Sequence, residues 1–176
     1  GRNRYLSKNN QNIKRINVIQ RCFPNSKILI PFREPLQHSN SLLTQHENFT
    51  IKQKDNDFFR KYMKWIGHSE FGIDYKPIMI EKTGYNDFNE LNHWLEQWYL
   101  IYNDLYKTLN RKNTMFICYE DLCNKKSFWT LIQNFIGISN VKYFQFNESY
   151  RRINVAYSEI LYKKCLLLYN NLREIL

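Results

Sequence analysis

Arg33 and Ser41 are the residues whose types and spacing most directly indicate chemistry. Arg33 follows an apolar run over residues 28–32, and Ser41 comes eight residues later. Ligands of open parallel sheets bind outside the carboxyl ends of the strands, where Arg33 would lie. A guanidinium presents a planar fork of donors that suits phosphate, and a serine hydroxyl adds a short neutral donor. The pair predicts a phosphate-binding corner; the alternative is an ordinary ion pair of Arg33 with Glu34.

The residues around this pair resemble a segment of a known family. Residues 23–35 read Phe-Pro-Asn-Ser-Lys-Ile-Leu-Ile-Pro-Phe-Arg-Glu-Pro, and Ser41 follows. This is similar to the PAPS-dependent sulfotransferases, in which an apolar strand ends in Arg-x-Pro and a serine follows at the same spacing. The resemblance implies that Arg33 and Ser41 bind the 3′-phosphate of 3′-phosphoadenosine 5′-phosphosulfate (PAPS). It also implies in-line transfer of the sulfonate to an acceptor hydroxyl or amine.

A second stretch, residues 115–122, resembles another part of the same family. It reads Met-Phe-Ile-Cys-Tyr-Glu-Asp-Leu, like the family's strand that ends in Tyr-Glu-Asp-Leu, whose tyrosine lies near the adenine. The resemblance implies that Tyr119 lines the adenine pocket; the alternative is a core tyrosine with a satisfied hydroxyl. We expect Asp121 to brace the segment that follows. Residues 135–138, Phe-Ile-Gly-Ile, match the helix ending that usually comes after this motif.

A third stretch lies near the start of the sequence. Residues 5–10, Tyr-Leu-Ser-Lys-Asn-Asn, resemble the short strand that carries Lys-Ser/Thr-Pro in many bacterial and carbohydrate sulfotransferases. The resemblance implies that Lys8 lies beside the reacting sulfonate. Asn9 and Asn10 stand where the family has Ser or Thr and then Pro, so a lone exposed lysine is the alternative.

His68 is the candidate general base. Residues 62–72, Tyr-Met-Lys-Trp-Ile-Gly-His-Ser-Glu-Phe-Gly, look like a stretch in some bacterial relatives, in which His68 and Glu70 would face the acceptor. Histidine titrates near neutral pH, and sulfonation of a hydroxyl needs a base. The alternative is a hydrogen-bonded structural histidine in a turn that ends a helix.

Arg151 and Arg152 stand before the last expected helix. In the family, basic residues near the C-terminus close over the cofactor's phosphate, so the resemblance assigns this pair to cofactor binding by charge and position. A solvated arginine pair is the alternative.

The sequence lacks the loop that would hold the other end of the cofactor. Neither Gly-x-x-x-x-Gly-Lys nor the family's Pro-Lys-x-Gly-Thr-Thr occurs. Such a loop supplies backbone N–H groups and a lysine to the 5′-phosphosulfate, and in the family it precedes the Arg…Ser segment. We expect a fragment of a longer sulfotransferase, with a degenerate homologue as the alternative. We expect little or no catalysis from this chain alone, and the chemistry requires no metal ion.

The net charge of +10 and the aromatic content of 16% also fit a nucleic-acid-binding module, through phosphate contacts and base stacking. Against this alternative, Trp94 and Trp98 follow a helical core stripe, and the basic residues form no single run. A P-loop kinase relative is a third alternative, opposed by the Arg-x-Pro…Ser spacing. We expect no nucleic-acid partner, and an acceptor that is a small molecule or a carbohydrate.

The four cysteines show neither a Cys-x-x-Cys motif nor zinc-ligand spacing, so we expect four reduced thiols, with Cys118 buried. No stretch approaches the roughly 18 apolar residues of a membrane span. We therefore expect a cytoplasmic chain without a membrane span.

The elements that must position these residues follow from the hydrophobic patterns. Strands are expected over residues 4–7, 27–32 and 114–118, the first two joined by a helix in a right-handed parallel βαβ unit. The alternation predicts one α/β domain over residues 1–176, with a P-loop-NTPase-like parallel sheet flanked by helices that lacks its N-terminal strand and phosphate loop. Helices are expected over 13–22, 36–46, 58–66, 87–109, 128–136 and 155–172, with a polar loop over 48–57 and an irregular segment over 72–86.

Overall fold

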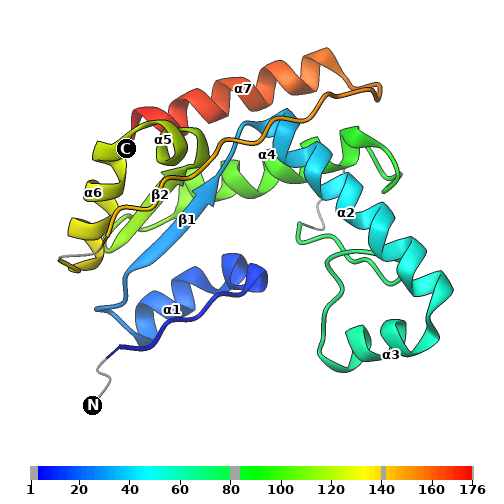
Figure 1. Cartoon of the computed structure of the whole chain (residues 1–176), viewed down its shortest axis with the longest axis horizontal. Coiled ribbons are helices and arrows are strands. Elements are labelled where there is room, and N and C mark those ends of the chain that lie inside the picture. Colours follow the sequence, from blue (N-terminus) through cyan, green and yellow to red (C-terminus); the bar gives the residue numbers. More distant parts are fainter. Residues whose placement is uncertain (1–3, 80–83, 140–141, 176) are drawn as a thin grey trace.

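The computed structural model describes residues 4–79, 84–139 and 142–175. Within them the chain is mostly helical, with one small parallel sheet, so its fold class is mixed α/β (Figure 1). The elements in chain order are η1 (Asn10–Arg15), α1 (Ile16–Cys22), β1 (Ile28–Phe32), α2 (Pro35–Asp55), α3 (Asp57–Trp65), α4 (Leu91–Thr108), β2 (Thr114–Cys118), α5 (Tyr119–Asn124), α6 (Lys126–Ile136) and α7 (Glu159–Glu174).

The sheet consists of β1 and β2, which pair in parallel from Ile28 beside Thr114 to Phe32 beside Cys118. The two strands therefore end level with each other. Pro31 has no N–H to give to a ladder, which restricts it to an edge strand, and its carbonyl accepts a hydrogen bond of 2.7 Å from the Tyr102 hydroxyl of α4. This bond holds the end of β1 against α4.

The core lies where α4 packs between α2, α7 and the sheet. The expected stripe on α4 is confirmed at Leu91, Trp94, Trp98 and Leu105, which are all buried. Phe32, at the end of β1, is also buried, and its ring meets those of Tyr102, Phe116 and Tyr169 edge-on at centroid distances of 6.3, 6.2 and 5.6 Å. Edge-to-face packing of this kind adds stability beyond the area that is buried.

The second helix is longer than predicted. α2 was expected to end at residue 46 before a polar loop over 48–57, but it continues to Asp55. No glycine or proline interrupts 47–55, and this polar stretch still places Gln53 on the buried face. Asn56 then ends α2 and caps α3, since its side chain accepts a hydrogen bond from the N–H of Phe59 at 3.0 Å. Polarity alone was therefore a poor sign of a loop.

The first expected strand is absent, so the expected βαβ unit is wrong for the described residues. Residues 4–9 form no regular element, and Tyr5 and Leu6 are exposed, because no neighbouring strand covers them. The helix expected over 13–22 is divided into the 3₁₀ helix η1 and the α-helix α1.

Other boundaries differ by a few residues. α4 begins at Leu91 rather than at residue 87, because Asp87 accepts the N–H of Asn89 at 2.9 Å and forms a turn instead. α6 spans Lys126–Ile136, and Gly137 ends it, as expected, in the left-handed conformation with φ of 64°. α7 begins only at Glu159, where Ser158 caps it.

The cysteines are free thiols, and Cys118 is buried, as expected. None of the helices in the described part of the chain is both long and apolar enough to cross a membrane.

Gly72 holds the irregular segment against α2, and replacing it tests this packing. Its φ is +86°, and a Cβ there would lie 2.3 Å from Oε1 of Gln53, the same oxygen that accepts the N–H of Ile73 at 2.7 Å. We expect Gly72→Ala to lower the free energy of unfolding by about 2–4 kcal/mol, from a strained backbone and a clash together. Urea denaturation measures this loss.

Gly67→Ala is the matched control, because Gly67 also has positive φ but open space around it. It should cost only about 1 kcal/mol. Equal losses for the two variants would contradict the role given to the Gln53 contact.

Candidate anion site at the strand ends

Arg33 and Tyr119 are the first residues after the paired ends of β1 and β2, so the sheet places them side by side. The guanidinium carbon of Arg33 lies 4.8 Å from the centroid of the Tyr119 ring, a cation–π arrangement. Because the strands pair in parallel and end level with each other, these two side chains emerge at the same edge of the sheet.

A segment without regular structure crosses these strand ends. We call residues 142–158 the strap; it leads to the start of α7 (Figure 1). Arg33 donates from Nη2 to the carbonyl of Ser149. The Tyr119 hydroxyl donates to the carbonyl of Asn147 at 3.2 Å and accepts the N–H of Ser149 at 3.1 Å. Backbone groups of the strap thus occupy donors that point out from the sheet.

Gln37, in the first turn of α2, holds the strap a little further along. Its side-chain amide donates to the carbonyl of Arg151 and accepts the N–H of the same residue, both at 2.9 Å. The amide of Gln37 therefore bonds both backbone groups of one strap residue, as the backbone of a paired strand would. Sequence reasoning missed Gln37, although a polar residue one turn before Ser41 on the same helix face was a usable signal.

The positive charge of Arg33 is not neutralised by an ion pair within the described residues. The alternative partner Glu34 is engaged elsewhere: its carboxylate accepts the N–H of Gln37 at 2.7 Å and the hydroxyl of Tyr162 at 2.9 Å. The Nε of Arg33 is buried and has no hydrogen-bond partner among the described residues. A buried N–H without a partner is costly, and an anion would remove that cost.

Glu120 braces the two strand ends from behind. One carboxylate oxygen accepts the N–H of Glu34 at 3.0 Å, and the other accepts the Tyr169 hydroxyl at 2.9 Å. These bonds tie the residue after β2 to the start of α2 and to α7. Sequence reasoning gave Glu120 no role, although it lies inside the Tyr-Glu-Asp-Leu motif.

Asp121 braces the helices that follow, as expected. It pairs with Lys125 at 2.9 Å and with Arg173 of α7 at 2.8 Å. It contributes to the frame of the site rather than to its donors.

Ser41 lies one turn beyond Gln37 on the same face of α2 and is half-buried. Arg33 and Ser41 do not share a hydrogen bond in the described structure; Arg33 contacts Ser149 of the strap, and Gln37 contacts Arg151. The side chains of Arg151 and Arg152 are exposed on the strap. The backbone of Arg151 is bound by Gln37, so both guanidinium groups are attached to a segment that crosses the strand ends.

His38 shows the positive character of this corner. The pKa of His38 is lowered to about 4, mainly by burial and also by the nearby Arg33, while Glu120 partly opposes the shift. The imidazole is therefore neutral at pH 7. Its Nδ1 is buried and has no hydrogen-bond partner in the described part of the chain.

The other expected catalytic residues lie elsewhere. Lys8 is exposed in the segment before η1, and no hydrogen bond or ion pair joins it to the described residues of the strand ends. His68 follows α3 and pairs with Glu70 at 3.3 Å. α2 has 21 residues, roughly 30 Å in length, and separates His68 from Arg33. The structure does not bring Lys8 or His68 to the strand ends.

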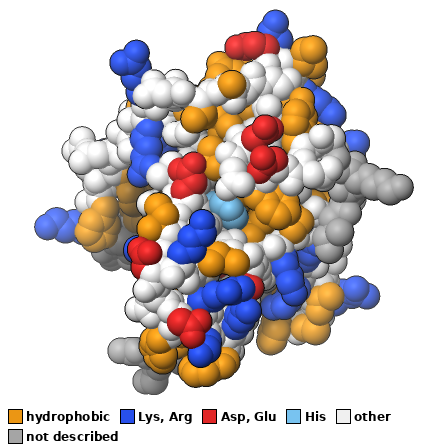
Figure 2. Space-filling view, turned by 90° about the vertical axis from the view of Figure 1, so that its right-hand side faces the viewer, with side chains coloured by type: hydrophobic (Ala, Val, Ile, Leu, Met, Phe, Trp, Pro, Cys, Tyr) orange, Lys and Arg blue, Asp and Glu red, His pale blue; other side chains and the backbone are white. Residues whose placement is uncertain are grey.

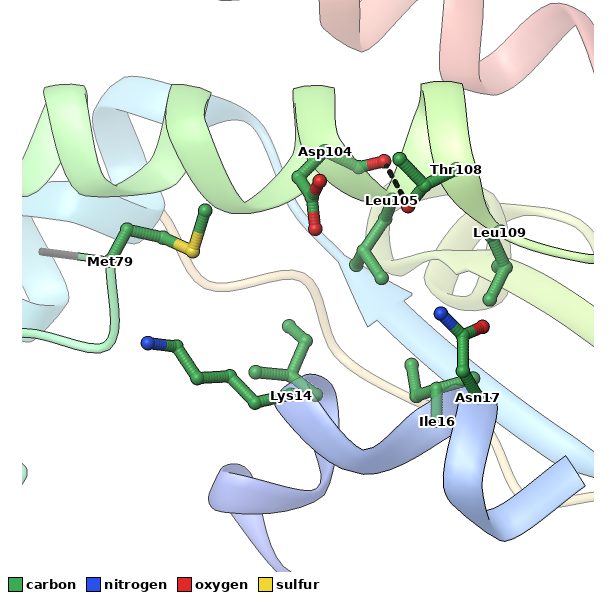
Figure 3. Close-up of a pocket in the computed structure, with 9 residues that line it drawn as sticks. Lys14, Ile16, Asn17, Met79, Asp104, Leu105, Thr108 and Leu109 are labelled. Atoms are coloured by element: carbon green, nitrogen blue, oxygen red, sulfur yellow. Dashed lines mark hydrogen bonds between the residues drawn. The ribbon is translucent and has the colours of Figure 1, made fainter. Parts of the chain in front are cut away.

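A separate cavity of about 310 Å³ lies between η1, α1 and α4 (Figure 3). Its polar side chains are Lys14, Asn17, Asp104 and Thr108, whose hydroxyl donates to the carbonyl of Asp104 at 2.8 Å. The rest of the lining is aliphatic. None of the residues around Arg33 contributes to it, so the cavity and the strand-end site are distinct.

Comparisons with known proteins give no match to this chain among family models, curated proteins or solved structures. In the described residues, no group of three His, Cys, Asp or Glu side chains is arranged to hold a metal ion.

The hold of Gln37 on the strap can be measured by hydrogen exchange. Gln37→Ala removes the acceptor for the Arg151 N–H, so exchange of that amide should accelerate by about tenfold, as expected for one lost bond of about 1 kcal/mol or more. The amide of Ser149 should change less, because Tyr119 still accepts it. Gln45→Ala, at an exposed position of the same helix, is the control substitution and should leave this amide unchanged. Unchanged exchange at Arg151 would show that the strap is held by other contacts.

The lowered pKa of His38 should make stability depend on acid. Above pH 6.5 its imidazole is neutral in both states. Between pH 6.5 and about 4 the unfolded chain binds a proton that the folded chain does not, so the free energy of unfolding falls, by up to about 3 kcal/mol. Urea titrations across this pH range should show a shallower loss for His38→Gln. His46 and His93 also have lowered pKa values but are present in both proteins. The same dependence of the unfolding free energy on pH in both proteins would show that His38 does not contribute to it.

Proposed function

We propose that the chain binds the 3′-phosphate of PAPS at Arg33 and forms part of a sulfotransferase site. The observation that carries the proposal is the state of Arg33: it stands at a parallel strand end, pairs with no carboxylate in the described structure, and has a buried Nε without a partner. A monoester phosphate supplies both the charge and the acceptors that this guanidinium lacks.

The roles of the neighbours follow from their positions. Ser41, on the α2 face that also carries Gln37, would add a neutral donor to the phosphate. Tyr119 presents one ring face to Arg33 at 4.8 Å, which leaves its other face for the adenine. In this proposal the fold is the strand-end portion of a P-loop-NTPase-like parallel sheet, of which β1 and β2 are two strands.

Binding requires an exchange at the strap. In the structure the carbonyl of Ser149 accepts from Arg33. A phosphate oxygen is a charged acceptor and forms a bond roughly twice as strong as a neutral one, so it would replace this carbonyl. The bonds of Gln37 to Arg151 can persist during the exchange, and the exposed side chains of Arg151 and Arg152 would then close on the phosphate.

The reaction would transfer the sulfonate of PAPS to an acceptor hydroxyl or amine and release 3′-phosphoadenosine 5′-phosphate. The sequence has no Pro-Lys-x-Gly-Thr-Thr loop, so the groups described here recognise the nucleotide and do not act on the sulfonate. Lys8 and His68 stay as predictions for that chemistry. The acceptor is proposed to be a small molecule or a carbohydrate, and the chain to be cytoplasmic.

The nucleic-acid alternative has less support. Trp94 and Trp98 are buried in the core, so they offer no face to a base. The site offers one unpaired guanidinium, that of Arg33, within the described residues, which suits a single phosphate better than a strand of nucleic acid.

The proposal is tested by ligand preference. Calorimetric titration should show tighter binding of 3′-phosphoadenosine 5′-phosphate than of 5′-AMP, because only the former carries the 3′-phosphate. Arg33→Ala should weaken the former by about tenfold or more while leaving 5′-AMP little changed, as expected for loss of charged hydrogen bonds.

Arg111→Ala is a matched control, because Arg111 also stacks on a tyrosine, with its guanidinium carbon 5.6 Å from the Tyr106 ring centroid. Arg111 precedes β2, at the opposite end of the strands. It should leave the preference intact. Equal affinity of the unaltered chain for both nucleotides would refute the site.

A further inference from the structure

α3 carries an aromatic surface that the proposed cofactor site does not use. Phe58, Tyr62 and Trp65 recur at helical spacing, and their exposed fractions are 66%, 46% and 72%. Phe58 stacks on Tyr62 and meets Trp65 edge-on, with ring centroids 6.3 Å apart in both pairs. We call these three residues the aromatic stripe. It is a continuous apolar surface rather than a set of scattered side chains.

The orientation of α3 is fixed by its other face. Phe59 packs against Phe49 of α2, with ring centroids 5.7 Å apart. Arg60 forms a two-pronged ion pair with Asp74, with N–O distances of 2.8 and 2.9 Å. Because these contacts hold the inner face, α3 cannot turn to bury the stripe in the core. The stripe is a stable part of the molecular surface.

Basic side chains border the stripe. Lys61 and Lys64 are exposed on the adjoining side of α3, and Lys52 and Lys54 are exposed at the end of α2. Asp57 pairs with Lys61 at 2.7 Å and Asp74 pairs with Lys64 at 3.1 Å, so part of this charge is compensated. Residues 52–76 still contain six Lys or Arg against four Asp or Glu, in a chain of net charge +10.

Figure 2 views the molecule from the side on which Figure 1 places α3. In the lower half of this face, Lys and Arg side chains gather around hydrophobic ones. Hydrophobic and cationic side chains therefore lie together on the side of the molecule where α3 is placed.

We propose that α3 docks the protein on an anionic lipid surface. Phe, Tyr and Trp are the side chains that favour the boundary between headgroups and acyl chains. A helix with such a face and lysines beside it lies in the plane of the interface, and the lysines gain energy near anionic headgroups. A nine-residue helix would rest on the bilayer without crossing it. The proposal does not depend on the cofactor assigned to Arg33.

Flotation with lipid vesicles tests this docking. The chain should float with vesicles of phosphatidylcholine and phosphatidylserine, and far less with phosphatidylcholine alone. The double variant Phe58→Ser with Trp65→Ser should have a vesicle partition constant lower by about tenfold or more, because two inserted rings are lost. Added salt should weaken binding of the unaltered chain, because salt screens the lysines.

The matched control is Ile160→Ser, which removes an 84%-exposed apolar side chain from α7 and should leave vesicle binding unchanged. Circular dichroism and urea unfolding should show all variants folded, since the stripe is exposed. Absence of binding to the anionic vesicles, or equal binding by the double variant, would overturn the proposal. So would a stable dimer in sedimentation velocity that the double variant dissociates, because the stripe would then be covered by a second copy of the chain.

Discussion

The parallel pairing of β1 with β2 is the constraint on which the rest of the described structure depends. It ends with Phe32 beside Cys118, and both side chains are buried beneath the strand ends. Because the two strands run in the same direction and end at the same level, the next residue of each, Arg33 and Tyr119, must emerge at one place. The aromatic side chains around Phe32 make this level costly to shift, since a register change would expose a ring that now has three edge contacts.

The carboxylates near the strand ends are held by other groups, which explains why none of them forms an ion pair with Arg33 in the described structure. Glu34 caps α2 and accepts the hydroxyl of Tyr162, while Glu120 accepts the N–H of Glu34 and the hydroxyl of Tyr169. Hydrogen bonds from backbone and tyrosine groups thus satisfy the acidic side chains that are closest in sequence. The acids hold the frame together, and the guanidinium above them is left to contact the strap or a ligand.

α2 connects two surfaces of different character. Its first turn carries Gln37 beside the strand ends, whereas its last turn leads through Asn56 into α3 and the aromatic stripe. The helix is roughly 30 Å long, so a ligand at Arg33 and a lipid surface at α3 would not compete for space.

The sequence by itself determined the two strands, the core stripe of α4 and the emergence of Arg33 and Tyr119 at strand ends, because short apolar runs and helical spacing depend on neighbours in the chain. It did not determine the length of α2 or the loss of the strand expected over residues 4–7. The helix continues through polar residues because Gln53 finds a partner in the segment around Gly72, and residues 4–7 find no strand to pair with in the described structure. Only the tertiary structure decided which acceptors Arg33 meets. Glu34 is its neighbour in sequence, yet the hydroxyl of Tyr162, more than a hundred residues away, holds that carboxylate. Hydrogen-bond partners at such separations are chosen by packing, and no local pattern in the sequence records that choice.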